Sequence, residues 1–93
     1  MSLTIHLPAN LQPATDGQAT ISLDTNPATV ADLIASLVAR FPDLRPLLLT
    51  SDGMLLSHVN VFVDGRSHRD IDGLQTSLAD AREIVFLTAL AGG

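Results

Sequence analysis

The sequence predicts an α+β fold in which a mixed sheet carries one main helix across one of its faces. Three observations predict it: two early segments alternate apolar and polar residues, one central segment repeats apolar residues with the helical period, and two later segments are apolar and β-branched. The length indicates a single domain, 1–93, and a hydrophobic fraction of 46% is enough for a core without disulfides.

The first two strands are predicted at residues 3–7 and 19–24, where the alternation is that of a half-buried strand. The segment between them contains Pro8, Asp16 and Gly17, which favour turns. We therefore expect the two strands to pair as a hairpin across this loop.

One helix is predicted over residues 29–41. Its apolar residues recur three and four positions apart and form a single stripe: Val30, Leu33, Ile34, Leu37, Val38 and Phe41. Thr29 is a suitable N-cap, Asp32 places a negative charge in the first turn, and Pro42 ends the helix. We expect the stripe, Val38 included, to pack against one face of the sheet.

Two further strands are predicted in the second half of the chain. Residues 59–64 alternate and are rich in β-branched side chains, and the Asp64-Gly65 pair at their end is a turn signal. Residues 83–88 are apolar on both faces, which indicates a central position in the sheet. This order of elements is that of the β-grasp arrangement.

The segment between the helix and these strands, residues 43–58, is less regular. Residues 47–50 fit either a short helical turn or a strand, and residues 51–53 read Ser-Asp-Gly, which indicates a tight turn.

The composition argues against several classes of function. The absence of cysteine excludes disulfides, thiolate zinc sites and a cysteine nucleophile. The net charge is −5 and the five basic residues, all arginines, form no cluster, so nucleic acid is not an expected partner. No apolar run approaches the ~18 residues that span a bilayer, and no signal peptide is visible. We expect a cytoplasmic protein that binds no membrane.

The polar side chains do not form a recognisable active site. His6, His58 and His68 lie on different predicted elements without the spacing of metal ligands, so we interpret them as solvated or hydrogen-bonded surface histidines. The aspartates gather at turns, where they cap backbone amides, and no serine stands in a nucleophile motif. We expect no metal site and no catalysis by this chain itself.

The last residues, 89–93, read Ala-Leu-Ala-Gly-Gly and are the sharpest functional feature. Directly after a central strand they would form a slim, flexible arm, because Gly92 and Gly93 lack a Cβ atom and can thread a narrow channel. An unhindered terminal carboxylate on Gly93 could attack the α-phosphate of ATP in an adenylating enzyme. The alternative is a frayed terminus of small residues.

The sheet face without a helix is a second candidate site. The alternation that points Ile5, Ile21, Val61, Ile84 and Phe86 at the helix also points four side chains outward: His6, Phe62, Val85 and Leu87. An aromatic residue flanked by aliphatic ones on a solvated face is typical of a partner-docking patch. Dimerisation and covering by residues 43–58 are the alternatives.

Together these features resemble the ubiquitin-like sulfur carriers of the MoaD/ThiS type. The resemblance covers the whole chain in element order and is most specific from residue 59 onward. It rests on the strand 59–64, the stretch Arg69-x3-Gly73-Leu74-x-Thr76, the pair Ala79-Asp80, and the strand that runs into Ala91-Gly92-Gly93. The pattern is nearest to the carriers of cysteine biosynthesis, and it is also similar to the small subunit of molybdopterin synthase.

The resemblance implies a mechanism and a set of partners. An E1-like enzyme would adenylate the Gly93 carboxylate with ATP, and a sulfur donor would displace AMP to leave a thiocarboxylate. A client synthase or another sulfur-accepting enzyme would then receive the sulfur, and the carrier itself would bind no cofactor. Phe62 and Leu87 match positions on the partner-facing surface of the family.

Three positions depart from the family pattern. Thr88 and Ala89 stand where molybdopterin-type carriers usually have prolines, and Ala81 stands where glycine is frequent before the last strand.

Two other functions would use the same fold and Gly-Gly end: a modifier conjugated to lysines of target proteins, and a ubiquitin-like interaction domain with an inert tail.

Overall fold

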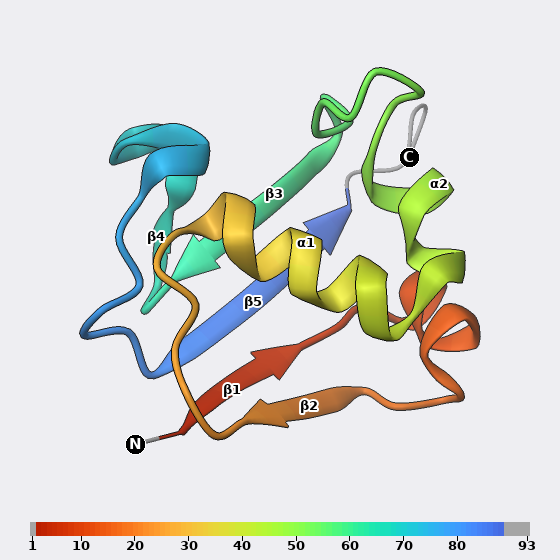
Figure 1. The fold of residues 1–93 in the computed structure, drawn as a ribbon, viewed down its shortest axis with the longest axis horizontal. Helices are drawn as coiled ribbons and strands as arrows, with labels where there is room; N and C mark the ends of the chain where they lie inside the picture. The colour runs from red at the N-terminus through yellow and green to blue at the C-terminus, as the bar shows by residue number, and fades with distance from the viewer. Residues whose placement is uncertain (1, 89–93) are drawn as a thin grey trace.

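One main helix lies across one face of a five-stranded sheet in the computed structural model, which describes residues 2–88 (Figure 1). The strands are β1 (Leu3–His6), β2 (Thr20–Leu23), β3 (Val59–Val63), β4 (Arg66–Ser67) and β5 (Glu83–Thr88). The α-helices are α1 (Val30–Arg40) and α2 (Arg45–Leu48). The 3-10 helical segments are η1 (Ala9–Thr15), η2 (Pro42–Leu44), η3 (His68–Asp70) and η4 (Gly73–Gln75).

The sheet is mixed, with the strand order β2-β1-β5-β3-β4. β1 and β5 run parallel, and the other neighbours are antiparallel. The first two strands form the predicted hairpin, with Ile5 opposite Ile21. β5 lies in the middle of the sheet, as its two apolar faces predicted. This arrangement confirms the predicted β-grasp fold.

α1 has the start and the end that the sequence predicted. The Thr29 hydroxyl accepts a hydrogen bond from the Asp32 amide at 3.3 Å, which caps the first turn. The helix ends at Arg40. Phe41 is its C-cap, and Pro42 then prevents the helix from continuing. Among residues 2–88, no helix is both long and apolar enough to cross a membrane.

The apolar stripe of α1 packs on the sheet and forms the centre of the core. Leu33, Ile34 and Leu37 are all buried, against the fully buried Phe86 and its neighbours on the strands. Val38, expected in the same contact, is only half-buried. It lies on the flank of the helix, where an apolar groove of about 360 Å³ separates α1 from the segment that contains Leu49.

β4 was not predicted from the sequence. Asp64 and Gly65 both have positive φ, 49° and 89°, which suits the two-residue turn of a tight hairpin. The turn returns the chain so that Arg66 pairs with Val63, but the new strand continues for only two residues. A strand this short has no alternation to detect.

The irregular segment 43–58 forms η2 and α2, followed by a turn. Leu44 and Leu48 are fully buried one helical turn apart, so the helical alternative is correct for the first part. Leu49 then forms an isolated β-bridge with Leu55 around the predicted tight turn. Figure 1 places α2 beside the C-terminal end of α1, on the helix side of the sheet.

Replacing Leu37 with alanine tests the central packing. Leu37 is 1% exposed, so Leu37→Ala should lower the free energy of unfolding by about 2–5 kcal/mol, through lost burial and the cavity left behind. Urea denaturation followed by circular dichroism measures this loss. Ser36→Ala, at an exposed position of the same helix, is the control and should change it by less than about 0.5 kcal/mol. Equal effects of the two substitutions would contradict this account of the core.

Candidate functional site

The four outward residues predicted from the alternation lie on the sheet face opposite α1. Their three strands are neighbours, and the register places Val85 of β5 directly between His6 of β1 and Phe62 of β3. Leu87 follows two residues further along β5, and 47% of its surface is exposed. We call these four residues the open-face patch.

The inward set is also as the alternation predicted. The side chains expected to face the helix are all buried: Ile5, Ile21, Val61, Ile84 and Phe86. The strand register predicted from the sequence is therefore correct. η2 contacts α1 and η1 in the helix layer, so this part of the 43–58 segment does not cover the open-face patch.

The patch has a polar end and an apolar end. Nε2 of His6 lies 2.9 Å from a carboxylate oxygen of Glu83, and both side chains are substantially exposed. Leu87 stands at the opposite end of β5, nearest the last residues of the chain. A partner that contacts Leu87 would therefore also be near the point where β5 ends. The role of the patch in docking stays a prediction.

The predicted reactive end lies outside the described residues. This applies to Ala91, Gly92 and Gly93. Within the described part of the chain, β5 ends at Thr88, so the last residues follow directly on the central strand of the sheet.

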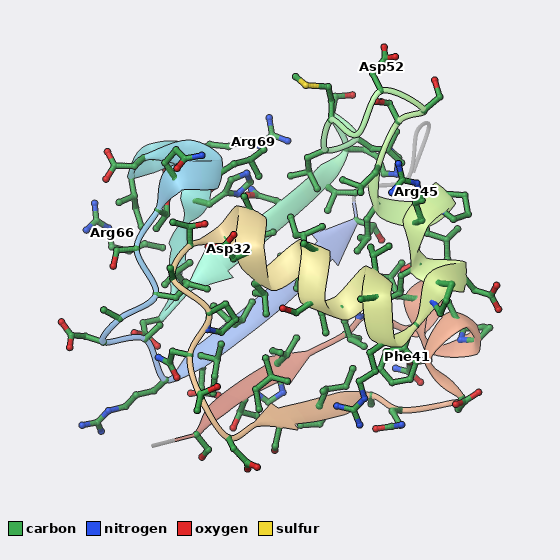
Figure 2. The ribbon with its side chains drawn as sticks, in the orientation of Figure 1. Asp32, Phe41, Arg45, Asp52, Arg66 and Arg69 are labelled. Atoms are coloured by element: carbon green, nitrogen blue, oxygen red, sulfur yellow. The ribbon has the colours of Figure 1, made fainter. Side chains whose placement is uncertain are left out.

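The outer edge of β3 is held by side chains where β4 does not reach. One guanidinium nitrogen of Arg69 donates to the backbone oxygens of Ser57 and Val59, at 2.9 and 2.8 Å. The backbone N–H of Val61 donates to Nδ1 of His68 at 3.1 Å. These bonds satisfy backbone groups that would otherwise be open to another strand. Figure 2 shows Arg69 beside this end of β3.

His68 is not the surface histidine that the sequence analysis expected. It is 3% exposed, because η3 folds back under the edge of β3 and carries the ring inside. Nδ1 also lies 3.2 Å from the Val61 oxygen and 3.1 Å from Oδ1 of Asn60, so it accepts from the Val61 amide in one tautomer and donates to an oxygen in the other. Burial lowers the pKa of His68 below its ordinary value of 6.5. A hydrogen bond from the ring N–H to the Val61 oxygen opposes this shift, and the positive charge of Arg69 adds to it.

The Arg69-to-Thr76 stretch that resembled a family motif has a structural role here. Thr76 is buried, and its hydroxyl donates to the Gly73 oxygen at 2.7 Å and accepts from the Asp72 amide at 3.1 Å. Gly73 has a φ of +62°, which favours glycine. The backbone oxygen of Thr76 accepts a hydrogen bond from the Val30 amide at 3.1 Å. The stretch therefore links the β3 edge to the start of α1.

A metal cluster, and a catalytic pair in the groove beside α1, are both absent from the described residues. In the part of the chain from 2 to 88, no three histidine, aspartate or glutamate side chains converge in a way that could hold a metal ion. The apolar groove beside α1 has one charged residue in its lining, Arg45, and contains no nucleophile paired with a base (Figure 2). The candidate site is therefore a contact surface together with the chain end.

Comparison with known proteins supports the resemblance seen in the sequence. The model of the ThiS family matches residues 5–93. The sulfur carrier protein CysO of Mycobacterium tuberculosis is 33% identical over 95 residues, and the match covers 100% of both chains.

Two solved structures have the same fold. SAMP1 from Haloferax volcanii has a TM-score of 0.82 and 29% identity, with 100% of both chains covered. A chain of the Amycolatopsis orientalis BexX/CysO complex has a TM-score of 0.81 and 27% identity, and covers 98% of this chain and 99% of its own.

The burial of neutral His68 predicts a dependence of stability on pH. Its pKa is lowered in the folded state, so the unfolded chain takes up the proton more readily. The stability that comes from the neutral ring should be complete above pH 6.5 and should be lost as the pH falls toward the folded pKa. Urea denaturation at a series of pH values between about 7.5 and about 5 measures this loss.

His68→Asn keeps an acceptor for the Val61 amide but removes the titrating ring. It should therefore make the dependence on pH shallower in this window, although it lowers stability overall. His58→Asn, at an exposed position, is the matched control. An unchanged slope in His68→Asn would show that the buried imidazole is not the cause.

Proposed function

The chain belongs to the ThiS family of ubiquitin-like sulfur carriers, and we propose that it carries sulfur as a thiocarboxylate on Gly93. The observation that carries this proposal is the match to a protein named a sulfur carrier, which covers 100% of both chains. The family match, which extends to the Gly-Gly end, supports it.

The proposed chemistry has two steps at the Gly93 carboxyl group, followed by transfer of the sulfur. The Gly93 carboxylate attacks the α-phosphorus of ATP in an activating enzyme, which releases pyrophosphate and forms an acyl adenylate. A sulfide equivalent then attacks the acyl carbon, AMP leaves with the C–O bonding pair, and a thiocarboxylate remains. The chain contains no cysteine, so the sulfur nucleophile comes from another molecule. The thiocarboxylate finally gives its sulfur to a client synthase or another accepting enzyme.

The open-face patch is the proposed docking surface for these enzymes. Its Val85 and Leu87 lie on the strand that leads to the chain end. Leu87 is exposed, and Phe62, opposite Val85, is half-buried. The solved BexX/CysO complex, which contains a similar chain, supports the expectation that carriers of this type bind a partner protein. An E1-like activating enzyme is the partner proposed for the adenylation step.

A second candidate function is conjugation to other proteins. The structure of SAMP1, whose name denotes a small archaeal modifier protein, is similar over the whole chain with a TM-score of 0.82. Conjugation and sulfur transfer use the same activated carboxylate, so they can coexist in one protein. An amide bond between Gly93 and a lysine of another cellular protein would identify the modifier. A thiocarboxylate without such conjugates would identify the carrier.

Mass spectrometry tests the modification of Gly93. Incubation with a cognate activating enzyme, ATP and sulfide should raise the intact mass by the difference between a sulfur and an oxygen atom. Fragmentation should place the increase on Gly93. Deletion of Gly93 should abolish it and leave the circular dichroism spectrum unchanged, because the core lies within residues 3–86. A mass increase in the deleted protein would contradict the proposal, as would no increase with an enzyme that activates other carriers.

Replacing Leu87 with aspartate tests the docking surface. Leu87→Asp should weaken binding to the activating enzyme by about 2 kcal/mol, measured by calorimetry, because it removes an apolar anchor. The melting temperature should change little, since Leu87 is largely outside the core. Asp52→Asn, on the turn after α2, is a control outside the patch and should leave binding unchanged (Figure 2). Normal binding by a folded Leu87→Asp protein would exclude this face as the docking surface.

A further inference from the structure

The end of β5 lies beside η1 because of the strand order. β1 and β5 are parallel neighbours, with Ile5 opposite Ile84 and His6 opposite Val85. Their C-terminal ends therefore meet at one edge of the sheet. The chain that leaves β1 forms η1 after only two residues, so this short helical segment stands next to the last residue of β5.

One hydrogen bond joins the two elements. The hydroxyl of Thr88, the last residue of β5, donates to Oδ1 of Asn10 in η1 over 2.8 Å. The two residues are 78 positions apart in the sequence. Thr88 also pairs with Val59 of β3, so its position is set from two sides.

η1 offers a firm support for this bond. Leu11, the neighbour of Asn10, is fully buried in the core. The hydroxyl of Thr15, also buried, donates to the Gln18 oxygen at 2.9 Å and closes the end of the segment. Asn10 itself is exposed, so its side chain is held by the segment that carries it and not by burial.

The alternation of β5 gives its last two residues different surroundings. Leu87 points to the open face, whereas Thr88 has the parity of Ile84 and Phe86 and points to the helix side. The geometry points to Thr88 and Asn10 as positioning residues: their bond, which we call the exit clasp, fixes Thr88, the last described residue of the central strand, from which the chain continues to Gly93. This inference rests on the proposed function for its purpose, because a directed chain end enters an enzyme channel at a lower entropic cost.

Paired substitutions on the full chain test the exit clasp. Thr88→Val removes the hydroxyl and keeps the shape, and Asn10→Ala removes the acceptor; Thr88→Ser keeps the bond and is the matched control. In the ¹⁵N-labelled protein, Thr88→Val and Asn10→Ala should each lower the heteronuclear NOE of the Ala89 amide, and the double variant should lower it no further. Thr88→Ser should leave it near the value of the unchanged protein.

Kinetics give the second readout. With a cognate activating enzyme, the carrier concentration for half-maximal adenylation should rise about fivefold in Thr88→Val, the size expected from losing one surface hydrogen bond. The maximal rate should stay the same, because Gly93 is unchanged. Unfolding midpoints within about 5 °C of the unchanged protein would show that the fold is retained.

Two results would overturn the inference: an unchanged Ala89 NOE in Thr88→Val, or an equal loss in Thr88→Ser. If Thr88→Val is adenylated and the carrier concentration for half-maximal adenylation is unchanged, the bond does not help to present Gly93 to the enzyme. If the unchanged protein is not adenylated by an enzyme that activates other carriers, the proposed function fails, and the NOE comparison still decides whether the clasp exists.

Discussion

The parallel pairing of β1 with β5 is the constraint on which the rest of this structure depends. It joins the first and the last strands of the chain in the middle of the sheet, so the core cannot form without both ends. It also places Ile5 beside Ile84, under the stripe of α1. The same pairing brings η1 to the end of β5. Fold stability and the position of Thr88 therefore have one physical origin.

A small domain has few strands with which to close its sheet, and this one closes an edge with side chains. β4 pairs with only two residues of β3, and Arg69 and His68 satisfy the backbone beyond them. Thr76 then ties the same region to the first residue of α1. The motif that resembles the sulfur carriers thus builds the scaffold behind β3, whereas the open-face patch and the chain end are the parts proposed to meet partners.

This division fits a protein on which enzymes act. The core fills the helix side of the sheet. The opposite side presents the open-face patch, whose apolar residues continue along β5 to Leu87. A carrier needs a recognisable surface and an accessible carboxylate, and neither requires a buried catalytic group. Membership of the ThiS family and a whole-chain likeness to SAMP1 both agree with such a role.

The sequence by itself determined the features that depend on local periodicity. The alternation of the strands predicted the inward and outward residues, Leu87 included, and the helical stripe and the Thr29 cap predicted α1, because each pattern reflects the geometry of one element. Only the tertiary structure decided the burial of His68, the brief β4 and the bond between Thr88 and Asn10. These depend on contacts between elements, up to 78 positions apart, and no local pattern records which side chains such contacts bring together.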